Sequence, residues 1–310
     1  RVALFVSDGK SYNVTVPAVT LSSPKGLDIG VSAGGTVRNW TTATEARFSV
    51  DGYSVLLLET ADRTAAERLQ QAVGDGTDKL SVFQRAKLGR TVYQVYAGTY
   101  ATSQEAAAAK QRIAANAKAA ALLAGAPPKV TGPLHLNAGA FPTEAEAERQ
   151  AALYGQQGLD SFVAIVDGGG APAYQVWIGE AADSAELAAV QAQAARFAPP
   201  GSLVPVNASA PYLMKRDDVT ASAPVRHYSF HASSQAVSVA PKEGGVAVAE
   251  KAGRQYRGTI ELSQHNGRLA VINELPFEQY LVSVVGAEMT PTWPAEALKA
   301  QAVAAPTFAL

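Results

Sequence analysis

The sequence predicts an α+β protein that contains two tandem β-α-β-β-α-β units. Four segments resemble one another at a period of 40–41 residues, and they start at Tyr53, Tyr93, Leu134 and Tyr174. Each reads as a short strand, a turn with a helix-capping residue, and an Ala-rich helix. At twice this period, TAAERLQQAVG from Thr64 aligns without a gap on AEAERQAALYG from Ala145. Such a duplication is typical of a supersecondary module used twice.

Composition favours a globular chain and argues against several classes of function. The chain has 310 residues, of which 47% are apolar and 17% charged, so two or three domains can each bury a core. A net charge of −1 gives no electrostatic basis for binding nucleic acid or an anionic membrane. The sequence contains no cysteine and no apolar run long enough for a transmembrane segment.

Residues 1–50 read as strands. An apolar run from Val2 leads into the turn signal SDGK, and alternation with β-branched residues resumes from Tyr12. Pro17 favours a strand end or an edge strand, because proline cannot donate a hydrogen bond to a sheet. No pattern of helical length occurs before Ala61.

The first unit is predicted over 51–131. Its expected strands are 53–59, 80–85, 91–97 and 129–131, and its expected helices are 62–73 and 103–121. Asp62 and Ser103 are the expected N-caps, and Gly74 is the expected residue after the first helix.

The second unit is predicted over 132–207. Its expected strands are 134–138, 161–166, 173–179 and 203–206, and its expected helices are 143–155 and 183–197. Two helices on one face of a four-stranded antiparallel sheet form the ferredoxin-like arrangement. Contacts between the two units would enlarge their modest cores.

Residues 211–310 form the third region, mainly short strands followed by helices. His265-Asn266-Gly267 is a hairpin signal, and helices are expected near 276–285 and 294–305. Pro294 suits the first turn of the last helix, and Pro306 ends it. Because the chain stops four residues later, we expect this region to be incomplete at its C-terminus.

Glu288 is the first candidate for catalysis. It lies in VVGAEMTPTWP between the last two predicted helices, beside Val284, Val285 and Trp293. An apolar recess there would partly desolvate the carboxylate, which favours general-acid chemistry. The alternative is a helix-terminal glutamate in water. No second carboxylate is placed for a two-carboxylate glycosidase.

The histidines do not predict a metal centre. His227 and His231 have the i, i+4 spacing that suits zinc on a helix, but they lie in a strand-like run, where they stand far apart. We expect ordinary surface or half-buried histidines and assign neither a metal nor a cofactor.

Aromatic and polar side chains follow the predicted strands of both units. Such a sheet can stack RNA bases, but the RNA-recognition signature is absent and the charge is not basic. Sugar rings are the alternative ligand, and strand alternation would place about half of these side chains in the core. The candidate glycan-binding residues are Tyr96, Tyr100, Asn137, Phe141, Gln175 and Trp177.

Two strand ends carry a Gly-small-aromatic pattern, AGTY from Ala97 and AGAF from Ala138, with a weaker IGEA from Ile178. With the repeat and the following Ala- and Glu-rich helices, this pattern resembles SPOR domains. The resemblance implies binding to bacterial peptidoglycan, in particular to glycan strands stripped of peptide stems.

The segments YLVSVVGAEM and WPAEALKAQAVAA, within 273–310, resemble the SpoIID/LytB family of stage II sporulation protein D and amidase enhancers. Residues 1–35 resemble the start of such proteins, so the repeats would be inserted into one split domain. The sporulation members are lytic transglycosylases that act on denuded glycan, and the Glu of their motif, here Glu288, is the acid/base. The family has Arg at the position of Pro306.

The resemblance implies cleavage of the β-1,4 bond after N-acetylmuramic acid. Glu288 would protonate the leaving oxygen and then accept the proton of the C6 hydroxyl. The alternatives are a non-catalytic glycan-binding protein or amidase enhancer, and a scaffold in a sporulation complex, with other cell-wall hydrolases or sporulation proteins as candidate partners. We expect an extracytoplasmic location, at the wall or in the intermembrane space of a sporulating bacterium, with secretion or anchoring through a segment outside this chain.

Overall fold

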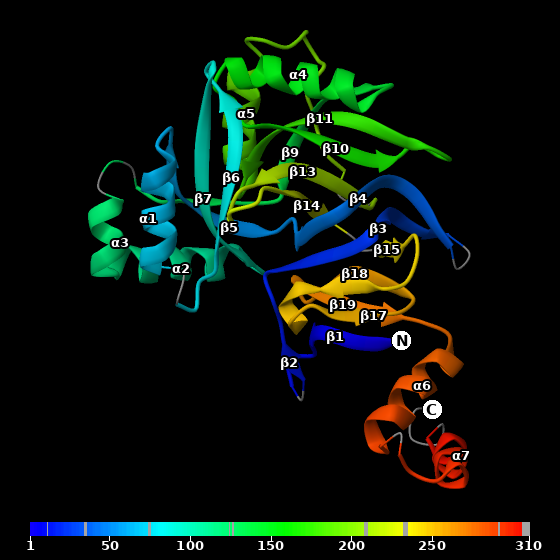
Figure 1. The fold of residues 1–310 in the computed structure, drawn as a ribbon. Helices are drawn as coiled ribbons and strands as arrows, with labels where there is room; N and C mark the ends of the chain where they lie inside the picture. The colour runs from blue at the N-terminus through cyan, green and yellow to red at the C-terminus, as the bar shows by residue number, and fades with distance from the viewer. Residues whose placement is uncertain are drawn as a thin grey trace.

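The computed structural model describes residues 1–10, 12–33, 36–73, 76–123, 125, 127–207, 210–231, 235–290 and 292–305. Within these ranges, nineteen strands join into one large mixed sheet, and seven α-helices accompany it (Figure 1). The predicted α+β class is therefore confirmed.

The first unit follows the predicted order of elements. Its strands lie in the order β8-β5-β7-β6, and each neighbouring pair is antiparallel. Its helices pack on one face of these strands over a core that includes Val55, Leu69 and Val95. The elements are β5 (Tyr53–Thr60), α1 (Arg63–Val73), β6 (Leu80–Lys87), β7 (Arg90–Tyr100), α2 (Ser103–Ala115), α3 (Ala117–Leu122) and β8 (Lys129–Thr131).

The second unit has the equivalent order, β12-β9-β11-β10, again antiparallel throughout. Its core includes Leu136, Tyr154 and Val176. Gly98 and Gly139, the glycines of AGTY and AGAF, have nearly equal φ angles of 130° and 132°. The elements are β9 (Leu134–Phe141), α4 (Glu144–Gln156), β10 (Ser161–Asp167), β11 (Pro172–Ala181), α5 (Ser184–Ala194) and β12 (Val204–Pro205).

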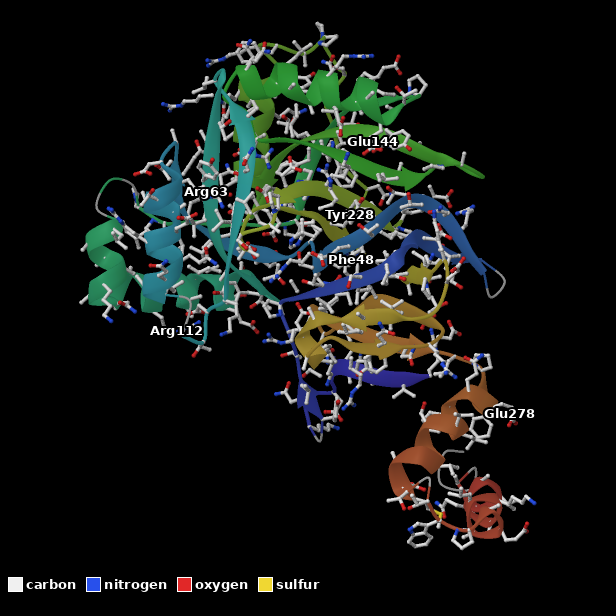
Figure 2. The ribbon with its side chains drawn as sticks, viewed as in Figure 1. Phe48, Arg63, Arg112, Glu144, Tyr228 and Glu278 are labelled. Carbon is white, nitrogen blue, oxygen red and sulfur yellow. The ribbon has the colours of Figure 1, made fainter. Side chains whose placement is uncertain are left out.

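The remaining strands combine both ends of the chain around another core. β1 pairs antiparallel with β19, and β4 pairs in parallel with β14. Phe48 stacks on Tyr228 between these strands, near the centre of Figure 2. The elements are β1 (Val2–Ser7), β2 (Asn13–Val14), β3 (Ala18–Ala33), β4 (Thr36–Val50), β13 (Tyr212–Asp218), β14 (Val225–His231), β15 (Val237–Pro241), β16 (Val246–Val248), β17 (Arg254–Tyr256), β18 (Thr259–His265) and β19 (Arg268–Glu274).

Strand β13 attaches both units to this third part. Ala164 of β10 pairs with Met214, whereas Phe83 of β6 pairs with Asp218. Each unit therefore contributes an edge strand to the same partner strand. This arrangement protects both edges, which would otherwise be open to pairing with another chain.

Helices α6 (Phe277–Glu288) and α7 (Ala295–Ala304) project from the body of the molecule, as Figure 1 shows in orange and red. They pack against each other and leave apolar side chains in water. Val282 is 65% exposed, Trp293 52% and Val303 78%.

Local capping corrects two expectations. The helix expected over 103–121 is broken at Asn116, because its side-chain oxygen accepts the N–H groups of Lys118 and Ala119 and so starts a second helix. Thr102, and not Ser103, caps α2. Asp62 accepts the N–H of Thr64, as an N-cap does. The predictions for Gly74 and Pro306 concern residues outside the described ranges.

Candidate functional site

The sheet faces that carry no helices meet at the junction between the two units. Gln94 on β7 is fully buried and donates to Asp160 of the second unit at 2.9 Å. Tyr96, on the same face, donates its hydroxyl proton to Glu180 at 2.8 Å. These hydrogen bonds, donated by buried side chains of the first unit, fix the relative position of the two units.

Arg216 of β13 lies at the centre of this junction. Its guanidinium pairs with Glu180 and lies 4.8 Å from the ring centre of Phe83 and 5.0 Å from that of Phe162. Burial opposes the positive charge, but Glu180 and the other neighbouring groups together outweigh it and raise the pKa of Arg216. The Nε atom of Arg216 is buried without a hydrogen-bond partner. An unpaired buried donor of this kind calls for an explanation.

Asp51, which follows β4, holds a first buried histidine. His135 Nε2 lies 2.8 Å from an Asp51 oxygen, and Tyr212 donates to the same oxygen at 2.5 Å. His135 Nδ1 lies 2.5 Å from the carbonyl oxygen of Gly179. Burial opposes protonation, but the charge and hydrogen bond of Asp51, with the Gly179 carbonyl, together outweigh it and raise the pKa of His135.

Asp218, the last residue of β13, holds a second buried histidine. His227 Nδ1 lies 2.9 Å from Asp218, and His227 Nε2 lies 2.8 Å from the Ser49 hydroxyl. Burial lowers the pKa of His227 and outweighs the opposing effect of Asp218. The expectation of a surface or half-buried histidine is therefore wrong for His227, which is 1% exposed; His231 is half-buried. No cluster of three His, Asp or Glu side chains suited to a metal occurs among the described residues.

The predicted glycan-binding residues do not form one surface. Tyr96 is 4% exposed and Trp177 is 1% exposed, so neither presents a ring to a ligand in this arrangement. Trp177 donates to Gln175 at 2.8 Å, and Asn137 accepts the N–H of Gly139. Phe141 packs at the edge of the second unit's core.

Tyr100 is the candidate that lines a groove. This groove, about 520 Å³ in volume, lies between the first unit, the segment 15–17 that follows β2, and the start of β19. Tyr100 donates to Asp78 at 2.8 Å, and Arg112 pairs with the same carboxylate at 2.7 Å. Arg268 pairs with Glu105 on the opposite side at 2.9 Å. Figure 2 shows Arg112 at the end of the first unit's helical layer.

The groove is shaped by a close approach between two regions. Gly267, in the β18–β19 turn, has φ +74°, and a Cβ there would lie 2.7 Å from Ala101 Cβ. Glycine is therefore required for the hairpin to approach the first unit at this point.

Glu288 is exposed to solvent at the end of α6. Gln301 of α7 donates a hydrogen bond to its carboxylate. The expected apolar recess is wrong, because α6 and α7 project from the body and Trp293 is 52% exposed.

Sequence reasoning did not single out Ser49, Asp51, Asp218 or Arg216. Ser49 and His227 are 178 positions apart, so no local spacing joins them. The available signal was that the polar Ser49 and Asp51 alternate with the apolar Phe48 and Val50 where β4 ends.

Comparison with known proteins defines the class. Residues 131–205 match the SPOR domain family, which implies peptidoglycan binding. This range covers the second unit. Residues 265–310 match the family described as stage II sporulation protein, SpoIID, which implies a role at the cell wall in sporulation. The predicted resemblance to the SPOR domain and to SpoIID is therefore confirmed.

A similar stretch occurs in an uncharacterized protein of Brachyspira hyodysenteriae. The two are 48% identical over 58 residues, which cover 19% of this chain and 16% of that protein. No solved structure matches the chain. Among the helices within the described ranges, none has the length and apolar character needed to cross a membrane.

Proposed function

We propose that this chain is an extracytoplasmic peptidoglycan-binding protein in which two SPOR-like, ferredoxin-like units, 51–131 and 132–207, are inserted into a split SpoIID-like domain, 1–50 and 211–310. The equal strand order of the two units supports the duplication. The core shared by β1, β4, β14 and β19 supports the split domain.

The groove at Tyr100 is the observation that carries the binding proposal. It offers an aromatic side chain and two guanidinium groups, Arg112 and Arg268, which are 52% and 40% exposed at their side chains. Sugar rings pack on aromatic faces, and the carboxylate of N-acetylmuramic acid matches a guanidinium. Because Tyr96 and Trp177 are buried, this groove is a better binding surface than the sheet faces.

Binding of purified glycan strands stripped of peptides tests this proposal. Tyr100→Ala together with Arg112→Ala should weaken the affinity by about tenfold or more, equivalent to about 1.4 kcal/mol. Tyr12→Ala is the matched control, because Tyr12 is 40% exposed and does not line the groove. Equal binding by the double variant and the wild type would exclude the groove as the glycan-binding site. Absence of glycan binding by the wild type would favour a protein scaffold.

Lytic transglycosylase activity is the second candidate, because the SpoIID match includes Glu288. In this proposal Glu288 protonates the leaving oxygen and then takes the C6 hydroxyl proton. Wild-type protein should release anhydromuramyl products from denuded glycan, and Glu288→Gln should abolish them. Glu296→Gln, a change in the exposed acid of α7, should leave them unchanged. Binding without products would favour the non-catalytic, amidase-enhancer alternative.

A further inference from the structure

Ser49, His227 and Asp218 form a linear hydrogen-bonded series. The Ser49 hydroxyl is 2.8 Å from His227 Nε2, and His227 Nδ1 is 2.9 Å from an Asp218 oxygen. Side-chain atoms of the same types are linked in the same order in serine hydrolases, on several unrelated folds. The series is held by three strands, because Ser49 is on β4, His227 on β14 and Asp218 on β13.

The protonation states of Asp218 and His227 allow His227 to accept a proton from Ser49. Burial opposes ionisation of Asp218, but hydrogen bonds from His227 and Thr220 lower its pKa and keep it charged. His227 has a lowered pKa and is neutral near pH 7. Its Nδ1–H therefore donates to Asp218, which leaves Nε2 free to accept the Ser49 proton.

A small cavity lies beside Ser49, and Arg216, which has an unpaired donor, is among its lining residues. Its volume is about 30 Å³, and Ser49, His227 and Arg216 contribute to its lining. The Nε atom of Arg216 is buried and has no hydrogen-bond partner. A preorganised cationic donor beside a nucleophile can stabilise the oxyanion of an acyl-transfer reaction.

The cavity adjoins the groove of Tyr100. Pro17, Gly98 and Thr99 line both spaces. The two spaces are therefore neighbours, and a ligand in the groove would have to pass these three residues to reach Ser49. The small volume limits the acyl group to about the size of acetyl, since a water molecule already needs about 10–15 Å³ by a similar measure.

We propose that Ser49, His227 and Asp218 form a hydrolytic site for acetyl-sized esters, with Ser49 as the nucleophile and Arg216 as the oxyanion donor. Ser49 Oγ bonds to the carbonyl carbon while its proton passes to His227 Nε2. The C–O bond to the alcohol then breaks, and His227 returns the proton to the departing oxygen. Water attacks the acetyl-serine, gives its proton to His227, and releases acetate as the proton returns to Ser49 Oγ.

Ester hydrolysis measures the reaction directly. The full chain should hydrolyse 4-nitrophenyl acetate at least tenfold faster than 4-nitrophenyl butyrate. Ser49→Ala should lower kcat/KM for the acetate by about a hundredfold or more. Ser238→Ala should leave it unchanged, because Ser238 is a buried serine of β15 that does not line this cavity. Ser229 lies opposite Ser49 on β14, lines the same cavity and is also 5% exposed, so it is the matched position for a thiol. A folded wild type without hydrolysis, or a Ser49→Ala variant with the full rate, would overturn the proposal.

Acetate release from O-acetylated glycan strands is the second measurement. Release of acetate from both the glycan and the small ester assigns a sugar ester as substrate, and release from the small ester alone assigns a free metabolite. Neither result depends on Glu288 or on the affinity for denuded glycan, so this proposal and the proposed function can fail separately.

A thiol in place of the hydroxyl supplies a readout independent of turnover. The chain has no cysteine, so Ser49→Cys and Ser229→Cys each introduce a single thiol. A thiol beside a base ionises below the ordinary value of about 8.5, while a buried thiol in apolar surroundings ionises above it. The absorbance of the thiolate should rise at lower pH in Ser49→Cys than in Ser229→Cys, and His227→Gln should remove the difference. Equal titration of the two thiols contradicts activation of Ser49 by His227.

Discussion

The junction of the three parts contains two buried His–Asp pairs that carry different charges. His135 with Asp51 has a raised pKa, whereas His227 with Asp218 has a lowered one. Both imidazoles are 1% exposed, and their distances to the carboxylate differ by 0.1 Å at most, being 2.8 and 2.9 Å. Neither burial nor the carboxylate alone therefore accounts for the difference.

The other neighbours of the two rings account for it, because Gly179 and Glu180 raise the pKa of His135, whereas Arg47 and Arg216 lower that of His227. His135 faces an acceptor at both nitrogens, the Asp51 carboxylate and the carbonyl of Gly179, so both nitrogens must carry a proton. His227 faces a carboxylate at one nitrogen and the Ser49 hydroxyl at the other, and a hydroxyl can donate. The first pair thus holds structure as an ion pair, and the second keeps a free basic nitrogen.

The largest expected effect comes from breaking the charged pair. Asp51→Ala removes the partner of a buried imidazolium and of the Tyr212 hydroxyl, and we expect a loss of about 3–5 kcal/mol in the free energy of unfolding. Asp218→Ala leaves a neutral ring with a missing acceptor, and a loss of about 1–3 kcal/mol is expected. Urea unfolding followed by circular dichroism measures both.

Asp51→Asn is the matched control for the first variant. It keeps an acceptor for Tyr212 but removes the charge, so its cost should be smaller than that of Asp51→Ala. If Asp218→Ala proved as costly as Asp51→Ala, the assigned difference in charge between the pairs would be wrong.

The pH dependence of stability should have opposite signs at the two histidines. An unfolded histidine titrates near 6.5. The raised pKa of His135 gives stability that is fully present below that pH and is lost as pH rises through its folded-state pKa. The lowered pKa of His227 gives stability that is present above about pH 6.5 and is lost as pH falls through and below that value.

Unfolding free energies measured between pH 5 and pH 9 separate the contributions of His135 and His227. His135→Gln should reduce the loss on the alkaline side, and His227→Gln should reduce the loss on the acid side. If His135→Gln reduced the loss of stability on the acid side, or His227→Gln reduced it on the alkaline side, the charges assigned to the two histidines would be wrong.

The sequence predicted the local elements far better than the junction. The repeat allowed each strand and helix to be placed twice, and the strands of both units occur within a few residues of the expected positions. The break at Asn116 was missed because side-chain capping competes with continued helix in a way that Ala-rich periodicity does not show. The pairing of β6 and β10 with β13 is non-local, so nothing in the repeat indicated that the faces bearing Tyr96 and Trp177 would be buried.

In the candidate sites too, local features were predicted better than contacts between distant segments. Glu288 was expected in a recess between the last two helices, but it is the last residue of α6 and is exposed, because its surroundings depend on tertiary packing. Tyr100 lines a groove because the Gly267 hairpin approaches its unit, which is a contact between distant segments. Residue type and spacing therefore identified individual candidates, whereas the groupings came from the topology.

The smallest expected effect tests the surroundings of the neutral pair. Arg47 Nε lies 3.6 Å from an Asp218 oxygen, and its charge contributes to the lowered pKa of His227. Arg47→Gln should therefore raise the pKa of His227 toward its ordinary value, with a stability change below about 1 kcal/mol, because Arg47 is a quarter exposed. A pH titration of the imidazole proton resonances by NMR measures the pKa of both histidines. The pKa of His135 should not change. Arg38→Gln, on the same strand but paired with Asp167, is the control and should leave His227 unchanged. If the two variants shifted His227 equally, net charge and not the local arginine would set its protonation state.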